Sequence, residues 1–390
     1  MLLVNCCQLL FKMINKRPFY IMHVIDALPL GGAERMLVEI ANATCDPDFR
    51  VSVCVTRSVT SLASELNPNI RLHVLNRTSR FSLDGVKKMA AILQEEPVDL
   101  FHVHGRPSFA FLSYASFLCR IKGAILLHDH DGWVETVHIM PLWFRILARI
   151  KIDYYVGVHE QMCHWARQGG IPSFRVGFIS NALNLMRFQE NRLPVSRAEI
   201  GVSDEDLLGV WVGGIRRQKG LHFLIEALHG CQRLSKVKVL IIGDINERDY
   251  YLECLQKIAA YKLEDVLVFT GRRTDIPSLV KIADFALLSS QSESGPLVLI
   301  EYLASGLPIV AVETGSISHR AAQHNIPGFV PVGDTIAYCH ALEELFQLSP
   351  EERRSRGALG VQVATEHFEI SQVMPEWYHV YRVALKKTSK

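Results

Sequence analysis

Residues 285–312 read FALLSSQSESGPLVLIEYLASGLPIVAV and contain the clearest structural pattern of the chain. The runs FALLSS and PIVAV at its two ends are short and apolar, which indicates two buried strands. Between them, Pro296 suits the first turn of a helix, and Gly306 followed by Pro308 ends that helix. A strand, a helix and a strand in succession are typical of a parallel sheet covered by helices.

The same alternation extends over most of the chain. Helical periodicity lies between most of the short apolar runs, for example at 33–43, 84–95 and 141–151. The predicted strands are 19–27, 51–56, 71–75, 99–103, 123–127, 153–158, 175–180, 208–213, 238–243, 265–271, 285–290 and 308–312. This pattern predicts an α/β protein built on doubly wound parallel sheets.

The length of the chain indicates two domains. Its 390 residues exceed what one hydrophobic core usually organises. Residues 182–206 are polar and irregular, and we expect them to link two Rossmann-like domains. The predicted division is an N-terminal domain at 1–185, a C-terminal domain at 186–370 and a helix at 371–390 that crosses back to the N-terminal domain. If the domains face each other, the cleft between them can hold one substrate on each wall.

The composition argues against several classes of protein. A net charge of +2 is too small to favour nucleic acid as a partner. Nine cysteines without a C-x-x-C spacing predict free thiols in a reducing, cytoplasmic setting, and they support neither disulfides nor a zinc site. The apolar start at 1–17 is too short to span a bilayer.

The first glycine pair, Gly31-Gly32, follows a predicted strand. Ligands of doubly wound sheets bind at the carboxyl ends of the strands. A helix is expected from Ala33, and its free N–H groups favour an anion. An ordinary turn that merely needs glycine explains this loop equally well.

A second glycine-rich loop, WVGGIRRQKG at 211–220, is basic. Cations beside a helix N-terminus suit a diphosphate, and the alternative is an ordinary solvated basic loop. Its position after a strand favours phosphate binding. The residues of interest in this loop are Gly214, Arg216, Arg217 and Lys219, and Gly220 opens the next helix.

Two glutamates, Glu293 and Glu301, flank the helix start in the opening stretch. The residues Ser294, Gly295, Pro296 and Leu297 supply free N–H groups there, and Glu293 lies just ahead of them. Glu301 lies on an otherwise apolar helix, where a carboxylate needs donors such as sugar hydroxyls. Taken singly, Glu293 is explained by the helix dipole, and Glu301 by an arginine partner or an exposed face. As a pair around a helix start that favours anions, they indicate ligand binding.

Two histidine-containing segments end predicted strands in the first half. They are FHVHGRPS at 101–108 and LLHDHDGW at 126–133. The second allows a metal site or a D-x-D motif, but its residues are adjacent and not spaced for convergence. A polar loop in which His128 forms hydrogen bonds is the simpler interpretation, and no metal is expected.

Taken together, these motifs resemble those of the family-4 glycosyltransferases, retaining enzymes with the GT-B fold. ESGPLVLIE at 293–301 matches the family's E-x7-E motif, and the segments GGAERMLVEIA, FISNALNLMRF and VGGIRRQKGLHFLIEAL occur in the family's order. The resemblance covers nearly the whole chain. One departure is Gly214, where the family usually has arginine, and Arg216 or Arg217 is a possible substitute.

The resemblance implies a role for each of these residues. Glu293 would contact the donor sugar, Glu301 the ribose, and Lys219 the diphosphate. His128 would face the donor sugar from the N-terminal domain, and Gly32 would approach the phosphates. A metal is dispensable, because a cation and a helix N-terminus can stabilise the leaving phosphate.

The predicted function is therefore transfer of a sugar from a UDP- or GDP-sugar to a glycan or a lipid-linked acceptor, with retention of configuration. Polysaccharide or lipopolysaccharide biosynthesis is the expected setting, and no cofactor is expected. The alternatives are a non-catalytic nucleotide-sugar or glycan-binding protein, which Gly214 keeps open, and a sugar-nucleotide epimerase. Turnover of a donor by the purified protein separates them.

The acceptor side rests on one segment, PLWFRILARIK at 141–151. Its apolar residues alternate with Arg145, Arg149 and Lys151, so the helix could lie on an anionic membrane. A helix that packs against the core is the favoured interpretation. The membrane alternative predicts peripheral contact at the inner face.

Overall fold

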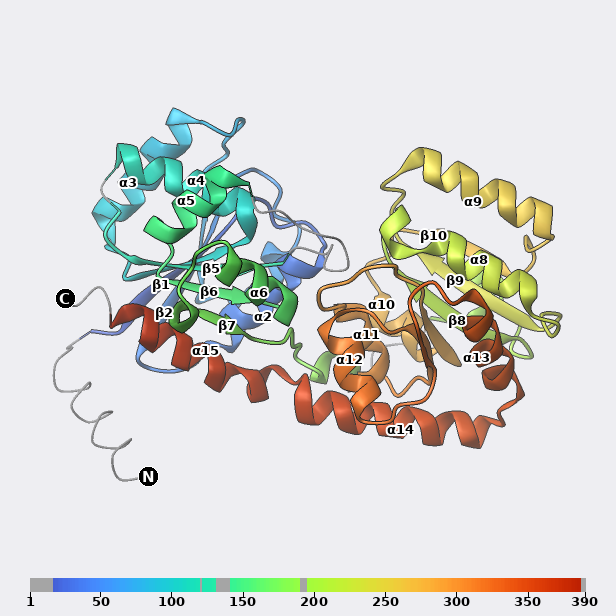
Figure 1. Ribbon diagram of the computed structural model, residues 1–390. Helices are drawn as coiled ribbons and strands as arrows, with labels where there is room; N and C mark the ends of the chain where they lie inside the picture. Colours follow the sequence, from blue (N-terminus) through green and yellow to red (C-terminus); the bar gives the residue numbers. More distant parts are fainter. Residues whose placement is uncertain (1–16, 120, 131–140, 190–194, 387–390) are drawn as a thin grey trace, which may run out of the picture. The chain divides into compact units, whose positions relative to one another are not determined.

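The computed structural model describes residues 17–119, 121–130, 141–189 and 195–386. The predictions about residues 1–16 lie outside these ranges, as does Asp131 of the D-x-D alternative. The described chain forms two compact units (Figure 1). The first holds the residues up to His130, those between 141 and Ile179, and those from Met374 onward; the second holds Ser180–Val373.

The first unit is built on a seven-stranded sheet with the order β3-β2-β1-β4-β5-β6-β7. Every pair of neighbouring strands is parallel. Because the order reverses between β1 and β4, the ends of these two strands form the switch point of a doubly wound sheet. The strands are β1 (Phe19–Ile25), β2 (Phe49–Val55), β3 (Arg71–Val74), β4 (Leu100–His104), β5 (Ala124–Asp129), β6 (Tyr154–Gly157) and β7 (Val176–Phe178).

Helices connect these strands, as the alternation predicted. They are α2 (Gly32–Ala43), α3 (Leu83–Glu95), α4 (Gly105–Leu118), α5 (Leu142–Lys151) and α6 (Glu160–Gln168). The C-terminal helix α15 (Ile370–Leu385) belongs to the first unit from Met374 onward.

The second unit holds a six-stranded sheet with the order β10-β9-β8-β11-β12-β13, again parallel throughout. Its switch point lies between β8 and β11. The strands are β8 (Leu207–Val212), β9 (Val237–Ile242), β10 (Leu267–Gly271), β11 (Phe285–Leu288), β12 (Ile309–Val312) and β13 (Phe329–Val330). The two-residue strand β13 is the one that the sequence pattern missed.

The helices of this unit follow the same scheme. They are α7 (Met186–Gln189), α8 (Leu221–Gly230), α9 (Arg248–Tyr261), α10 (Ile276–Lys281), α11 (Leu297–Ala304), α12 (Gly315–Gln323), α13 (Thr335–Gln347) and α14 (Pro350–His367). The predicted linker at 182–206 lies within this unit, and Leu183 forms a β-bridge with Glu369.

Candidate functional site

The loop after β8 approaches the loop after β11 at the switch point of the second sheet. Residues Arg217–Lys219 form a 3-10 turn, and Gly220 follows with a φ of 68° before α8 begins. A Cβ atom at Gly220 would lie 1.9 Å from the carbonyl oxygen of Ser289. Only glycine therefore permits this close approach, which places Lys219 beside the 289–296 loop.

Lys219 and Glu293 meet at this point. The Lys219 Nζ donates to Glu293 Oε1 at 2.5 Å, and the Ser290 hydroxyl donates to the same oxygen at 2.7 Å. Glu293 is buried, with 6% of its surface exposed. Two charge-assisted hydrogen bonds thus hold the carboxylate in one orientation.

Neighbouring elements fix the backbone around Glu293. Its N–H donates to the Thr314 hydroxyl at 3.0 Å. The Ser316 N–H and hydroxyl both donate to the Ser294 carbonyl, and the Asn181 amide donates to the Gly295 carbonyl at 2.7 Å. Neither Asn181 nor Thr314 was predicted as a site residue, although Asn181 lies within the segment FISNALNLMRF.

Helix α11 begins at Leu297, with Pro296 at its N-cap and not in its first turn. The aligned N–H groups at this end of the helix give it a partial positive charge. The helix is attached to the neighbouring strand, because the Val212 N–H donates to the Tyr302 hydroxyl at 2.8 Å. Glu301 lies partly exposed on this otherwise apolar helix, about one turn from its start.

The arginines of the basic loop do not join this pair. Arg217 binds Glu253 of α9 at 2.5 Å, and its guanidinium lies 5.0 Å from the ring of Tyr250. Arg216 is exposed. Arg217 is thus directed to α9 and not to Glu293, through an exposed ion pair. At Gly214 a Cβ atom would lie 1.9 Å from the Asn246 side chain.

The Gly31-Gly32 pair lies in the first unit, where α2 begins at Gly32, one residue before the predicted start. Gly31 has a φ of −156°, an extended conformation that does not require glycine. A Cβ atom there would instead meet the Glu34 carboxylate at 2.3 Å. Burial raises the pKa of Glu34. An acidic side chain therefore already lies beside this helix N-terminus, which weakens the case for an anion site there.

The sequence pattern predicted that His128 lies in a polar loop, and the structure contradicts this. Strand β5 continues to Asp129, and His128 is fully buried within it. Its ring centroid lies 4.7 Å from that of Trp377 in α15. Burial lowers the pKa of His128 well below its ordinary value, so the ring is neutral near pH 7.

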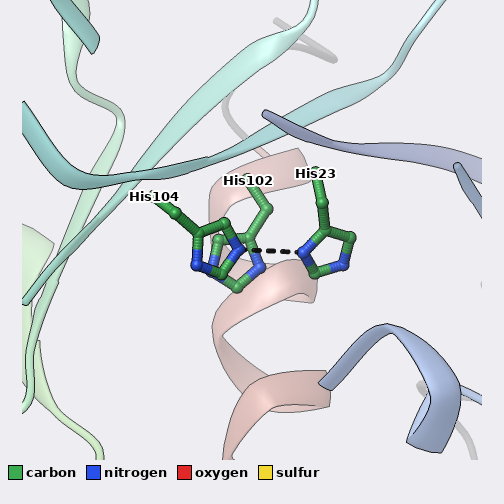
Figure 2. Close-up of side chains that lie close together, drawn as sticks. All are labelled: His23, His102 and His104. Atoms are coloured by element: carbon green, nitrogen blue, oxygen red, sulfur yellow. Dashed lines mark hydrogen bonds between the residues drawn. The ribbon is translucent and has the colours of Figure 1, made fainter. Parts of the chain in front are cut away.

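His128 belongs to a cluster of histidines on one face of the first sheet. Because side chains alternate along a strand, residues two apart share a face, and the register brings His23 beside His102 and His104 beside His128. The expectation that these residues do not converge is therefore wrong. We call this set the histidine cluster; its members are His23, His102, His104, His128 and His130 (part of it is shown in Figure 2).

Helix α5 packs against the core on one face, as the favoured interpretation predicts, but it also exposes apolar side chains on the other. Phe144 and Ala148 are buried, but the side chains at 142, 143, 146 and 150 are exposed, and Ile150 is 70% exposed. Two cations extend this surface: Arg80 lies over the rings of Trp143 and Phe81, and Lys151 over the ring of Phe117. We call it the α5 patch; it comprises Phe81, Phe117, Leu142, Trp143, Ile146 and Ile150, all exposed.

Comparisons with protein families match both units. A model described as Glycosyltransferase Family 4 matches residues 30–187, and one described as Glycosyl transferases group 1 matches residues 194–358. Together they cover most of the chain, one in each half.

The chain is also similar to known proteins and solved structures over most of its length. The N-acetyl-alpha-D-glucosaminyl L-malate synthase of Bacillus anthracis is 24% identical over 85% of this chain and 89% of its own length. An Escherichia coli UDP-Gal:alpha-D-GlcNAc-diphosphoundecaprenol alpha-1,3-galactosyltransferase is 20% identical over 82% of this chain and 86% of its own. The crystal structure of Anabaena HepE in complex with UDP and glucose superposes with a TM-score of 0.78 at 20% identity, over 93% of this chain and 99% of that one.

Proposed function

This chain belongs to the family-4 glycosyltransferases, and we propose that it transfers a sugar from a UDP-sugar to a lipid-linked or glycan acceptor with retention of configuration and without a metal. The observation that carries the proposal is the contact of Lys219 with Glu293 beside the start of α11. A cation, an anchored carboxylate and a helix N-terminus meet there at a switch point, where doubly wound sheets bind ligands.

The leaving group determines what the enzyme must stabilise. When the bond between the anomeric carbon and the phosphate oxygen breaks, negative charge grows on the diphosphate. In this proposal the Lys219 ammonium, which Glu293 holds in place, and the N-terminus of α11 stabilise that charge. We assign Lys219 and the N–H groups near Gly295 and Leu297 to the diphosphate. The acceptor attacks from the face that the diphosphate leaves.

The two glutamates bind hydroxyl groups of the donor. Glu293 is oriented by Lys219 and Ser290, and its second oxygen accepts from the transferred sugar. Glu301, one turn further along α11, accepts from the ribose. We assign His128 no direct contact with the donor, because its side chain is enclosed in the first unit.

Similar proteins support the choice of substrates. HepE has been crystallised with UDP and with UDP-glucose, and the E. coli relative is named for a UDP-Gal donor and a diphosphoundecaprenol-linked acceptor. We infer a UDP-sugar donor and a sugar on a lipid diphosphate as the acceptor for this chain.

Such an acceptor lies in a membrane, and the α5 patch suits binding to its surface. No helix of the described residues is long and apolar enough to cross a bilayer. The patch combines exposed apolar side chains with cations, which is the pattern of surfaces that lie on anionic lipid. We place the enzyme at the inner face of the membrane, with the first unit toward the lipid.

Incubation of the full chain with UDP- and GDP-sugars, with and without a lipid diphosphate-linked sugar, tests the function. We expect transfer from one UDP-sugar with retained configuration by NMR, and an unchanged rate in excess EDTA. Donor binding without turnover for any acceptor would favour the non-catalytic alternative, and conversion of donor alone into an isomer would favour the epimerase. An inverted product, or loss of the transfer step with EDTA, would contradict the proposed mechanism.

A further inference from the structure

The histidine cluster is buried at the switch point of the first sheet. Hydrogen bonds between its members do not give every ring nitrogen a partner. His23 Nδ1 and His104 Nε2 are 3.0 Å apart, and His102 Nε2 and His128 Nδ1 are 3.3 Å apart. Even with these contacts, the Nε2 atoms of His23 and His128 are buried without a hydrogen-bond partner. Buried polar atoms without partners are rare, so hydrogen bonding alone does not account for five histidines at this place.

We propose that His23, His102 and His104 bind one divalent transition-metal ion of the zinc class. Ring nitrogens of these three residues all lie within 4.8 Å of one another. Figure 2 shows the ring of His23 directed toward those of His102 and His104, with a hydrogen bond between His23 and His104. His23 and His102 are partners in the register of strands β1 and β4. Imidazole nitrogens are preferred ligands of zinc, copper and nickel ions.

The spacing of the nitrogens agrees with such an ion. Four ligands placed tetrahedrally at about 2.0–2.1 Å from zinc are roughly 3.3–3.4 Å from one another. The separation of His23 Nδ1 and His104 Nε2, 3.0 Å, is close to that value. For this pair a shift of a few tenths of an ångström reaches the tetrahedral value, and His102 must bring its nitrogen from within 4.8 Å of the other two to the same separation.

The surroundings of His102 resemble the second shell of a metal site. Its Nδ1 lies 3.0 Å from the Tyr381 hydroxyl of α15, and its ring centroid lies 4.8 Å from that of Trp377. A hydrogen bond to the second ring nitrogen orients a ligating histidine, and an apolar cover restricts water. Both features are present in the part of α15 that belongs to the first unit.

A second set of three, His104, His128 and His130, also brings its nitrogens together. His23, His102 and His104 are all fully or almost fully buried and lie within strands, whereas His130 follows the end of β5 and is only partly buried. His104 is common to both sets. The site built entirely on strands is the more rigid, and we assign the ion to it.

The ion would stabilise the fold of the first unit, with three histidines as protein ligands and a water molecule in the fourth tetrahedral position. It would tie β1 to β4 in the first unit, whereas the residues assigned to the donor, Lys219 and Glu293, lie in the second. This inference does not depend on the proposed function, and removal of the ion is expected to lower the unfolding temperature without abolishing the chemical step.

Metal content of the purified full chain tests the proposal. After incubation with zinc chloride and desalting, we expect about one zinc per chain by elemental analysis, and cobalt chloride should give the visible absorption of a nitrogen-ligated ion. His23→Gln should weaken zinc binding at least tenfold, since loss of a second-shell partner alone costs about 10–100-fold. The exposed His164→Gln is the matched control and should retain the ion. His130→Gln removes the contact at 3.3 Å with His104 Nδ1 and serves as the comparison for the second set.

The wild-type chain decides the question even where a variant fails to fold. A folded wild-type chain that retains no zinc and gives no cobalt spectrum would overturn the proposal and leave hydrogen-bonded histidines. Binding that survives in folded His23→Gln but is lost in His130→Gln would overturn the choice of residues.

Discussion

At the scale of single residues, Glu293 combines burial with a defined orientation. Its carboxylate is held by Lys219 and Ser290, and its backbone by Thr314. A side chain positioned this firmly is suited to recognise one arrangement of sugar hydroxyls. We expect binding of the nucleotide alone not to require this side chain.

Replacement of Glu293 by alanine is expected to abolish transfer while UDP alone still binds. Loss of an oriented acceptor that acts in the transition state typically lowers kcat by about 10²–10³-fold. Steady-state rates and UDP titration by calorimetry measure the two effects. Glu253→Ala is the control, because that carboxylate is exposed and pairs with Arg217. Unchanged transfer in Glu293→Ala would contradict the assignment.

Asp26, at the end of β1, carries a negative charge that pairs with a buried arginine of the first unit. Burial alone would raise the pKa of Asp26, but hydrogen bonds from Thr56, Arg77 and Arg57 outweigh it and lower that pKa. The Arg77 side chain is 2% exposed and pairs with this carboxylate. Asp26 thus neutralises a buried guanidinium.

Asp26→Asn is therefore expected to lower the free energy of unfolding by about 2 kcal/mol at pH 7, because it leaves the buried Arg77 without its anion. Because the folded pKa lies below the unfolded value of about 3.9, this stabilisation is complete above pH 4 and is lost as the pH falls through the folded pKa. Urea unfolding at pH 7 and pH 3 measures the effect. Asp84→Asn, in an exposed pair with Lys88, should change stability by less than about 0.5 kcal/mol. If wild type and Asp26→Asn differ in their free energy of unfolding by the same amount at pH 7 and at pH 3, this account is contradicted.

At the scale of elements, the loops after β8 and β11 depend on Gly220. Gly220 and Gly201 both have positive φ values, 68° and 72°, but only Gly220 faces a backbone atom within 4 Å. Gly201 therefore serves as a control for the backbone conformation itself.

Gly201→Ala should cost about 1 kcal/mol, the strain of a left-handed residue. Gly220→Ala carries the same strain and also forces the Ser289 carbonyl away, so we expect a larger loss of stability and a raised KM for the donor as Lys219 moves. Thermal unfolding and donor kinetics measure both effects. Equal behaviour of the two variants would show that the close approach of the loops is unimportant.

Elements with a clear period were predictable from the sequence. The runs FALLSS and PIVAV became β11 and β12, and the helical stretch predicted at 84–95 lies in α3. The two-residue strand β13 has too few residues to show a period.

Contacts between distant segments were less predictable. The histidine cluster depends on the register of β1, β4 and β5, which no single segment reveals. The direction of Arg217 depends on Glu253, which lies 36 positions further along the chain. The pairing of Lys219 with Glu293 was not predicted. It arises because the two loops follow strands β8 and β11, which are neighbours in the sheet.

At the scale of the whole molecule, the two units present different chemistry. The second unit carries the Lys219–Glu293 pair at its switch point, and the first carries an apolar surface with cations beside it, the α5 patch. The sequence indicated that α5 is amphipathic, but it did not indicate which of the apolar residues face the core. In the structure, only Phe144 and Ala148 of this helix are fully buried. That distinction came from packing.

The α5 patch is expected to bind vesicles that contain anionic phosphatidylglycerol more tightly than neutral phosphatidylcholine vesicles, and salt should weaken that binding. The double change Ile146→Glu with Ile150→Glu should reduce it at least tenfold, because each buried aliphatic side chain contributes about 1.5–3 kcal/mol. Vesicle co-sedimentation measures the partitioning. Ile336→Glu, at a residue of the second unit that is 73% exposed, is the control and should leave binding unchanged. Equal binding of the double variant and the wild type, or no preference for anionic lipid, would mean that the acceptor reaches the enzyme by another route.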